Sequence, residues 1–488
     1  MILPPVPDRA LLELGRTEGG PDTLALLVRD QDTRRLLMLR AVLDAVEGAD
    51  PAVCSAGERR RVREDWGLLE EADGVRTAPP AGTADAMPSA EPLSPARALL
   101  LSPLAGPWAR RCLRALDPGS GGCTEQRIRD LRHDLSHFSA LAAVAAARAG
   151  ISFTVRLTAW DGVLTLPSLG ALSTAGSGDA EVEAVHRQGR LTLRRREAGD
   201  VTVHLESGFG AWSSAPTWSP AHALPGLLPA SAPMPLDDLD PYRTVRGAPR
   251  YQGLSGPVTL DDAERKRWLQ AWSGTAAALR LGGEHRVAEA TALLRCLVPL
   301  ATPPGAGADE HGSGSCSGTR REAFGALLSS TPPTSAVFAA TLVHELQHTK
   351  LSALSEAVTL HQADARARYF APWRPDPRPY DGLLQGAYSH LALADFFQRC
   401  ALVTTHPAQR ESAWAQHARC REQVGAVLPV LVGSPDLTAR GRRFVDQMVT
   451  VYERMTEQPP PRGHVARARA YVEATRALWT QRHAPARP

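Results

Sequence analysis

Apolar side chains recur at helical spacing through much of the chain. Residues 21–71 and 96–149 place leucine, valine and alanine among arginines and acids, which is the pattern of amphipathic helices. Residues 337–354 form a third such region, and the Thr-Pro-Pro-Thr-Ser before it, at 331–335, supplies a proline stop and candidate N-caps. Residues 383–397 predict a further, more apolar helix.

The period changes from helical to alternating after residue 150. Residues 153–160 alternate apolar and polar side chains, Asp161 and Gly162 mark a turn, and residues 163–166 predict the returning strand of a hairpin. Three more strands are expected at 182–185, 190–195 and 201–205. The fold class is therefore α+β, predominantly α-helical, with a small antiparallel sheet in the middle of the chain.

The second half of the chain predicts additional helices. Thr-Leu-Asp-Asp at 259–262 offers an N-cap and an acidic first turn, and another helix is expected over about residues 284–300. Loops are predicted at 77–95, which is rich in Pro, Ala and Ser, and at 306–319, which is rich in Gly and Ser. The second loop precedes the third helical region, so it is either a surface loop or a lid over that helix.

Length and charge narrow the class of protein. The chain has 488 residues, 43% of them hydrophobic, which is enough for two or three ordinary cores. We expect an N-terminal region over residues 1–245 and a C-terminal region over residues 246–488. The 55 basic and 52 acidic side chains leave a net charge of +3, which predicts no general attraction to nucleic acid or to anionic membranes.

Cysteine usage and the start of the chain predict a cytoplasmic protein. The seven cysteines are widely spaced and include no C-x-x-C pair, which fits reduced thiols. The first residues lack a charged segment followed by a long apolar one, and no apolar run is long enough to span a bilayer. Export and membrane anchoring are therefore not expected.

The third helical region contains the pattern H-E-x-x-H, formed by His344, Glu345 and His348. Residues four apart lie about 40° from one another around a helix axis, so both imidazoles can reach one metal ion. Glu345 lies about 100° round from His344, where its carboxylate can touch metal-bound water. The alternative is a helix whose two histidines merely pack against other side chains.

A catalytic metal needs a third protein ligand. His390, in the predicted helix over 383–397, is the first candidate, and Asp395 in the same helix is the carboxylate alternative. His361 lies in a polar stretch and is a weaker candidate. A lone histidine on an apolar helix is otherwise a satisfied core residue. Lys350 points away from the histidine face and is expected at the surface or behind the ligands.

Two arginines lie in a proline-rich segment between these helices. Proline at positions 372, 375, 377 and 379 stiffens the backbone around Arg374 and Arg378, so both side chains can be held in fixed directions at little entropic cost. Guanidinium groups near a metal suit bidentate binding of a carboxylate or a phosphate. The alternative is a rigid surface connection whose arginines are solvated.

Two other clusters have both a chemical and a structural interpretation. His133 and His137 have the same i, i+4 spacing without a glutamate, and they predict ordinary helix histidines more than a second metal site. Asp237, Asp238 and Asp240 could serve a metal or act as a general acid, but a turn before a proline attracts the same residues.

Four stretches, taken together, resemble one known family. They are Ala-Phe-Gly-Ala at 323–326, Leu-Val-His-Glu-Leu-Gln-His-Thr-Lys-Leu at 342–351, Ala-Pro-Trp-Arg-Pro-Asp-Pro-Arg-Pro at 371–379 and Leu-Gln-Gly-Ala-Tyr-Ser-His-Leu at 384–391. This combination resembles the HExxH-type 2-oxoglutarate-dependent peptide β-hydroxylases, and it is far more specific than H-E-x-x-H alone. Weaker similarity at 34–40, 166–170 and 238–243 extends the likeness over most of the chain.

The resemblance implies a mononuclear Fe(II) enzyme that uses O2 and 2-oxoglutarate to hydroxylate the β-carbon of a residue in a ribosomally made precursor peptide. The site residues that it implies are His344, His348 and His390 as iron ligands, Arg374 or Arg378 as the clamp on a 2-oxoglutarate carboxylate, and Glu345 as a neighbour of the metal or a ligand. Three histidines depart from the usual set of two histidines and one carboxylate, which leaves the third ligand and the role of Glu345 open.

Two other functions use the same residues differently. A zinc metallopeptidase would employ Glu345 as the general base that acts on zinc-bound water. A non-catalytic peptide-binding protein would recognise a leader peptide through its N-terminal half and carry a vestigial motif. The identity of the metal and the effect of Glu345→Gln on activity distinguish the peptidase from an oxygenase. Binding of the precursor peptide without metal distinguishes the non-catalytic protein from both enzymes.

Overall fold

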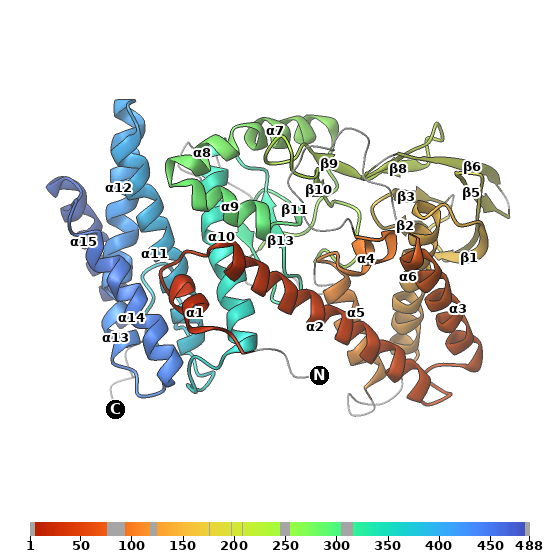
Figure 1. Cartoon of the computed structure of the whole chain (residues 1–488), viewed down its shortest axis with the longest axis horizontal. Helices are drawn as coiled ribbons and strands as arrows, with labels where there is room; N and C mark the ends of the chain where they lie inside the picture. Colours follow the sequence, from red (N-terminus) through yellow and green to blue (C-terminus); the bar gives the residue numbers. More distant parts are fainter. Residues whose placement is uncertain are drawn as a thin grey trace.

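A computed structural model of the chain describes residues 5–75, 93–117, 124–174, 176–196, 198–206, 208–244, 254–303 and 316–483. The protein is α+β and predominantly helical, as the hydrophobic pattern predicted. Figure 1 shows the C-terminal helices at one end, small sheets at the other, and helix α2 (Pro21–Gly48) running between them. Most of the predicted loops at 77–95 and 306–319 lies outside the described residues.

The predicted helical regions of the N-terminal half are each divided into shorter helices. Region 21–71 becomes two helices because residue 50 precedes Pro51, and the residue before a proline disfavours helical geometry. The second helix then restarts with a capping box, in which Ser55 and Glu58 satisfy each other's backbone N–H groups. The helices after α2 are α3 (Ala56–Gly74), α4 (Pro95–Leu100), α5 (Ala105–Leu116) and α6 (Glu125–Arg148).

Two antiparallel sheets follow these helices. The five-stranded sheet has the order β1-β4-β5-β6-β7 and the three-stranded sheet the order β2-β3-β8. The first comprises β1 (Phe153–Ala159), β4 (Ala180–Arg187), β5 (Arg190–Arg195), β6 (Ala198–Leu205) and β7 (Ala211–Trp212). The second comprises β2 (Val163–Leu166), β3 (Gly170–Ser173) and β8 (Trp218–Pro220).

The predicted hairpin between residues 153 and 166 is wrong in its pairing. Its turn exists, with positive φ at Asp161 and Gly162, but β1 pairs with β4 and β2 pairs with β3, so a single bridge at Trp160 joins the two strands. Each strand pairs where its buried side chains meet other buried apolar side chains: Leu157 lies opposite Val182, and Leu164 lies opposite Leu172. Core burial therefore overrides the local hairpin signal.

A mixed sheet in the C-terminal half was not predicted. It has the order β12-β13-β11-β10-β9, with β11 parallel to both β10 and β13. The predicted helix over 284–300 is wrong after Leu293, because β11 occupies the last five positions and all five are buried. A fully buried parallel strand reads as a continuous apolar run, which periodicity cannot distinguish from a helix. The strands are β9 (His222–Leu224), β10 (Met234–Leu236), β11 (Cys296–Leu300), β12 (Ser317–Gly318) and β13 (Ala326–Ser330).

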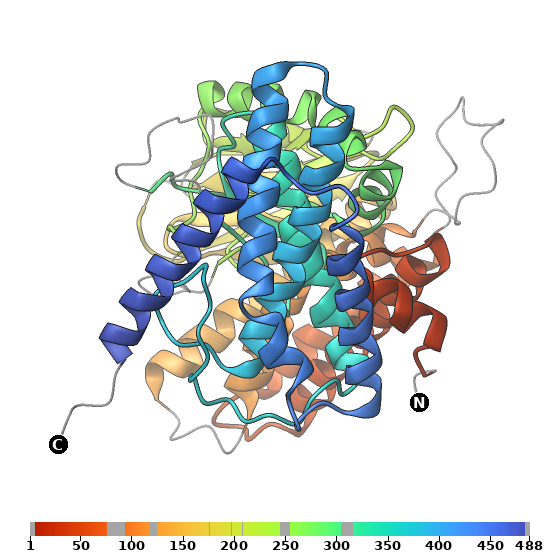
Figure 2. The same ribbon diagram turned by 90° about the vertical axis from the view of Figure 1, so that its left-hand side faces the viewer.

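Most of the C-terminal half is a helical assembly, in which α11, α12 and α14 stand side by side (Figures 1 and 2). The helix that carries H-E-x-x-H starts as predicted, because the Thr334 hydroxyl accepts a hydrogen bond from the Val337 N–H at 3.2 Å. The helices are α7 (Asp262–Ser273), α8 (Thr275–Leu281), α9 (Glu284–Leu293), α10 (Ser335–Ala357), α11 (Tyr380–Val403), α12 (Pro407–Gly425), α13 (Leu428–Val432), α14 (Ala439–Arg454) and α15 (Arg462–His483).

Helix α2 belongs to both of the large hydrophobic cores formed by the described residues. Its first turns bury Leu24 and Leu27 in the core that surrounds α10 and α11, whereas Leu39, Val42 and Val46 enter the core beneath the N-terminal sheets. The predicted division at residue 245 stays a prediction, and the packing does not follow it, because the start of the chain is built into the C-terminal core. None of the described helices is both long enough and apolar enough to cross a membrane.

A buried ionic network lies behind α10. The Lys350 ammonium is 2.6 Å from one Glu289 carboxylate oxygen, and the Arg286 guanidinium is 3.0 Å from the other. Both cations also donate to the carbonyl of Thr17, at 3.1 and 2.7 Å. The surface alternative for Lys350 is therefore wrong, because its side chain is fully buried. The network ties α10 and α9 to the turn between α1 (Asp8–Gly15) and α2.

Glu289→Gln should destabilise the fold strongly. The change leaves two buried cations without their shared carboxylate, and removing one partner of a buried ion pair costs about 3–5 kcal/mol. We expect urea unfolding to show a free energy of unfolding lower by about 3 kcal/mol or more. Glu64→Gln is the matched control, because the ion pair of Glu64 with Arg60 is largely exposed. This variant should leave the free energy of unfolding almost unchanged. Equal shifts in both variants would contradict the assignment.

Candidate metal centre

Helix α10 brings His344 and His348 together as the four-residue spacing predicted. Their Nε2 atoms face each other at 3.2 Å, and the rings are nearly perpendicular, with centroids 4.8 Å apart. Burial, followed by the neighbouring imidazoles, holds the pKa of His344 well below its usual value. At neutral pH His344 therefore keeps a lone pair instead of a charge.

Helix α11 adds His390 to this pair. The His390 ring lies 5.3 Å from that of His344, measured between centroids, and burial lowers the pKa of His390 to about 4. Its Nδ1 donates to the Gly386 carbonyl at 2.8 Å, and the Nδ1 of His348 donates to the Gln385 side-chain oxygen at 3.1 Å. A proton on Nδ1 leaves Nε2 free, which is the tautomer that metal-bound histidines adopt.

Glycines on one face of α11 allow the proline-rich segment to pack against this site. Gly382, Gly386 and His390 are four residues apart and share a face. A Cβ at Gly386 would lie 2.4 Å from the ring of Trp373, and one at Gly382 would lie 2.9 Å from the Arg378 guanidinium. Trp373 then stacks on His390 with centroids 4.5 Å apart and planes 21° apart. The lack of a side chain at Gly382 and Gly386 thus lets Arg378 and Trp373 pack against α11, where Trp373 orients His390.

The histidine geometry fits a metal with two nitrogen ligands from α10. Ligands at about 2.1 Å from an ion lie about 3.0 Å apart at 90° and about 3.4 Å apart at 109°, and the observed separation is 3.2 Å. The buried Nδ1 of His344 has no hydrogen-bond partner among the described residues. As the side chains stand, no group of three or more His, Cys, Asp or Glu residues within the described chain forms a complete metal-binding set.

Glu345 is fully buried beside the histidines and is held by hydroxyl groups. Its carboxylate accepts a hydrogen bond from the Ser317 hydroxyl at 2.8 Å, and Ser317 begins β12. Burial raises the pKa of Glu345 above its usual value, against the lowering effect of His348 and the hydroxyl donors Ser317 and Thr319. The start of strand β12 thus fixes the Glu345 carboxylate through Ser317.

Arg374 and Arg378 line the same cavity, of about 550 Å³, as the three histidines and Glu345. An antiparallel bridge anchors the backbone of Arg378, whose N–H and C=O bond those of Tyr369 at 2.9 Å each. The Arg374 side chain donates to Asp376 at 3.2 Å. The Nε of Arg378 is buried with no hydrogen-bond partner among the described residues. A terminal nitrogen of Arg378 is 3.7 Å from the same Asp376 carboxylate, so both arginines share this partner, and Arg378 keeps its Nε as an unused donor.

Two alternative ligands lie elsewhere. Asp395 is buried among three arginines, 3.0 Å from Arg399, 2.8 Å from Arg454 and 3.7 Å from Arg286, so it is committed to ion pairs instead of the histidine site. His361 is 3.6 Å from Asp381 and does not line the cavity. Helices α10 and α11 therefore bring His390 next to His344. They bring neither Asp395 nor His361 there.

Sequence reasoning missed three residues that support the site. Gln385 holds His348, Trp373 stacks on His390, and Ser317 holds Glu345. A signal was available for Gln385, because it is a polar residue one turn before His390 in an otherwise apolar helix. Nothing local marks Ser317, which reaches Glu345 only because β12 pairs with β13 beside α10.

The second histidine pair and the acidic turn also take defined positions. His137 is buried, and desolvation lowers its pKa to about 3. Asp237 accepts a hydrogen bond from the Asp240 N–H at 3.0 Å, and Asp240 accepts one from the Tyr242 N–H at 2.7 Å. These are the side-chain-to-backbone bonds of turns, so the structure favours the turn interpretation of the acidic cluster.

Comparison with known proteins identifies no relative. No protein-family model matches the chain, and no curated protein is similar enough in sequence to count as a match. The family resemblance therefore stays a prediction, and the function has to be inferred from the site.

Gly386→Ala should weaken metal binding. The added methyl group meets Trp373, which must move and release its stack on His390. Loss of an orienting contact on a histidine ligand typically weakens metal affinity about 10–100-fold. Titration with Co(II), followed by visible absorption, should show a loss in this range. Gly67→Ala on α3 is the control, because nothing lies within 4 Å of its added Cβ; unchanged affinity in Gly386→Ala would refute the role of the glycine.

Asp240→Asn should remove part of the pH dependence of stability. Burial, and then the Asp237 carboxylate, raises the pKa of Asp240 from 3.8 to about 7. The folded state therefore binds more protons than the unfolded state between these values, and stability falls as pH rises through the window. Asparagine keeps an acceptor for the Tyr242 N–H and does not titrate. Between pH 5 and pH 8, the free energy of unfolding measured with urea should fall less in the variant than in the wild type. An identical fall in both proteins would contradict the assignment.

Proposed function

We propose that the protein is an Fe(II)- and 2-oxoglutarate-dependent oxygenase that hydroxylates the β-carbon of a residue in a ribosomally made precursor peptide. The observation that carries the proposal is the meeting of three histidines with two arginines at one cavity. Neutral imidazoles suit a divalent iron, and guanidinium groups suit the carboxylates of the co-substrate. Three of the four sequence stretches that resemble the peptide β-hydroxylases, at 342–351, 371–379 and 384–391, contribute the histidines, Glu345 and the two arginines of this cavity.

Each group in the cavity has a distinct task in this proposal. His344, His348 and His390 hold the metal through Nε2, while Gln385 and the Gly386 carbonyl keep the Nδ1 protons of two of them in place. When bound, iron would supply the activation of O2, coupled to conversion of 2-oxoglutarate to succinate and CO2, with one oxygen atom delivered to the peptide.

Arg378 is the preferred partner for a 2-oxoglutarate carboxylate. Its unpartnered Nε can donate together with a terminal N–H group, which gives the planar two-bond contact that carboxylates prefer. Arg374 lies on the same rigid segment and donates its Nε to Asp376 at 3.2 Å, whereas Arg378 approaches that carboxylate only with a terminal nitrogen, at 3.7 Å. The prolines keep both arginines in place before the co-substrate arrives, so little conformational entropy is lost on binding.

Glu345 has a structural task in this scheme. Burial raises the pKa of its carboxyl group, and the Ser317 hydroxyl holds it. A carboxyl in this position would fix α10 against β12. The third ligand would then come from α11 and not from this residue.

A zinc metallopeptidase is the second candidate, and one observation favours it. Glu345 lines the same cavity as the histidines, and a raised pKa brings a carboxylate closer to the range in which a general base works well. The arginines favour the oxygenase, because its co-substrate brings two carboxylates to the cavity. The bond from Ser317 also holds Glu345 in a fixed direction.

The test is anaerobic loading with Fe(II) and 2-oxoglutarate, followed by O2 and measurement of succinate. We expect slow succinate formation without peptide in the wild type, its loss in His348→Ala, and a rise of at least tenfold in the 2-oxoglutarate concentration needed for half-maximal rate in Arg378→Met. His204→Ala, on an exposed position of β6, should retain the wild-type rate.

The other outcomes assign the alternatives. Absence of succinate together with retained zinc and cleavage of casein, abolished by Glu345→Gln, would establish the peptidase. Absence of succinate, of cleavage and of metal binding would leave a non-catalytic peptide-binding protein. Succinate formation that survives His348→Ala would contradict the assigned ligand set.

A further inference from the structure

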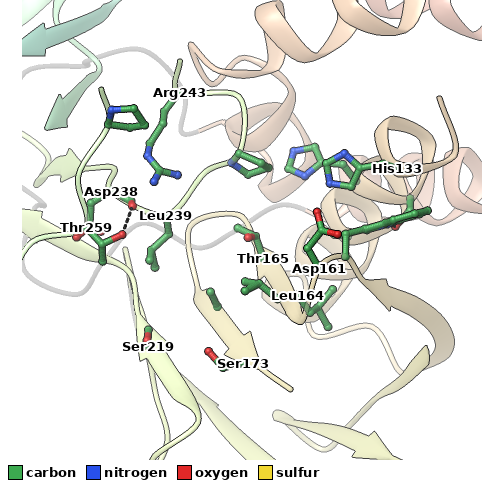
Figure 3. A pocket seen from close by; sticks show the side chains of 18 of the residues that line it. His133, Asp161, Leu164, Thr165, Ser173, Ser219, Asp238, Leu239, Arg243 and Thr259 are labelled. Atoms are coloured by element: carbon green, nitrogen blue, oxygen red, sulfur yellow. Dashed lines mark hydrogen bonds between the residues drawn. The ribbon is translucent and has the colours of Figure 1, made fainter. Parts of the chain in front are cut away.

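A second cavity of about 550 Å³ lies in the N-terminal half, away from the histidines of α10. Figure 3 shows His133 and Asp161 on one side of it, Asp238, Leu239 and Arg243 on the other, and Thr165 and Ser173 below. Its volume lies within the range of about 300–1,000 Å³ that ligand pockets commonly have.

The floor of this cavity is one face of the three-stranded sheet. The register pairs Val163 with Ser173, Thr165 with Ala171, and Ala171 with Ser219, so these side chains share a face. The opposite face carries Leu164, Leu166, Leu172 and Trp218, which enter the core. The cavity thus exists because the outer face bears small, mostly hydroxyl-bearing side chains. Ser173 and Ser219 are exposed.

The two walls of the cavity are tied to each other. Helix α6 supplies His133 and His137, and the facing wall is the acidic turn that contains Asp238. The Tyr242 hydroxyl, from that turn, donates to the buried Asp134 carboxylate of α6 at 2.8 Å. The Asp237 and Asp240 side chains hold the turn through its backbone. The cavity is therefore a preformed feature of the fold.

A second hollow, of about 220 Å³, adjoins the cavity at Trp160. The two share Ser136, Thr158 and Trp160 as lining residues. The Trp160 indole is fixed, because it donates to the Ser136 hydroxyl at 3.0 Å and meets the edge of the His133 ring. A compact ligand fills one hollow, whereas an elongated chain can fill both. The shape therefore favours an extended occupant. We call the two hollows together the Trp160 groove.

The polar groups of the Trp160 groove suit a peptide backbone. Buried Asp238 has one carboxylate oxygen without a hydrogen-bond partner among the described residues, and Arg243 has a buried Nε in the same condition. They can accept from an amide N–H and donate to a carbonyl. Arg243 lines the same cavity as the carboxylates of Asp161 and Asp238, so the groove lacks the positive excess that phosphates require.

An open strand edge adds to this chemistry. Strand β2 is the outer strand of its sheet, and Val163 bonds Trp160 across that edge through both its N–H and its C=O. Strand backbone alternates with a period of two, so the N–H and C=O of Thr165 point to the same open side. An extended peptide can add to such an edge.

The groove and the metal cavity are connected by a short segment of chain. Leu254 lines the metal cavity, and Pro257 lines the groove. Three residues span at most about 11 Å between Cα atoms. A second link runs from β12 to the acidic turn, where Arg320 donates to the Tyr242 carbonyl at 2.9 Å. A single extended peptide of several residues can therefore occupy both sites.

We propose that the Trp160 groove is a docking site for an extended segment of the peptide substrate, which it holds while another residue of the same peptide lies at the histidine cavity. This inference rests on the proposed function for the identity of the peptide. The groove would provide affinity for a flanking segment, and the metal cavity would select the residue to be modified. Recognition and chemistry would then be separable by mutation.

The probe is a displayed library of random linear peptides, selected on the full-length protein without added metal. Enriched peptides are measured by fluorescence anisotropy on the wild type, on Ser173→Trp and on Ser219→Trp, which fill the floor from exposed positions. We expect at least tenfold weaker binding to both variants. Thr202→Trp, a strand hydroxyl on β6 outside the groove, is the matched control and should bind as the wild type does. Far-UV circular dichroism and thermal unfolding check that each variant is folded.

A benzophenone-bearing version of an enriched peptide locates the contact directly. Crosslinks should fall within β2, β3, β8, helix α6 or the turn that contains Asp238. Unchanged affinity in both groove variants, crosslinks confined to other elements, or a selection that enriches no peptide would each overturn the proposal. His348→Ala should keep the peptide affinity. Loss of succinate formation with intact groove binding would refute the oxygenase alone, and normal succinate formation with no groove binding would refute the docking site alone.

Discussion

The buried ionic network behind α10 is the constraint on which the metal site depends. Lys350 and Arg286 share the Glu289 carboxylate and the Thr17 carbonyl, all away from water. Arg286 also approaches Asp395 of α11 at 3.7 Å. One set of charges therefore positions the helix with two histidines, the helix with the third, and the N-terminal turn. Because each charge is buried, the helices have little freedom to separate without exposing an unpaired ion.

Two glycines of α11 also determine how the candidate site is built. Glycine at 382 and 386 lets the proline-rich segment approach α11 closely, so that Arg378 and Trp373 pack where side chains would otherwise stand. The segment is stiffened by prolines, and its Trp373 stacks on His390 of the helix. The result is a cavity whose polar groups are held before any ligand binds, which is the arrangement that reduces the entropic cost of binding.

The N-terminal half relates to this site through packing and through chain connectivity. Helix α2 enters both cores, so the two halves are not independent. The segment from Leu254 to Pro257 passes from the metal cavity to the Trp160 groove. An enzyme that modifies one residue of a longer peptide requires such a separation, because the reacting side chain and the recognised segment are different parts of one substrate.

The sequence alone determined the helical fold class and the two-histidine helix, because both depend on local periodicity that tertiary contacts reinforced. It also identified the arginines and His390 as candidates. It did not determine the strand over Cys296–Leu300, since a buried strand and a buried helix share the same apolar run. Tertiary structure alone removed Asp395 from the ligand candidates by placing arginines around it, buried Lys350 against Glu289, and set Ser317 beside Glu345. Apart from the Arg399–Asp395 pair, which is four residues apart on one helix, these contacts join residues distant in sequence, and no local pattern encodes them.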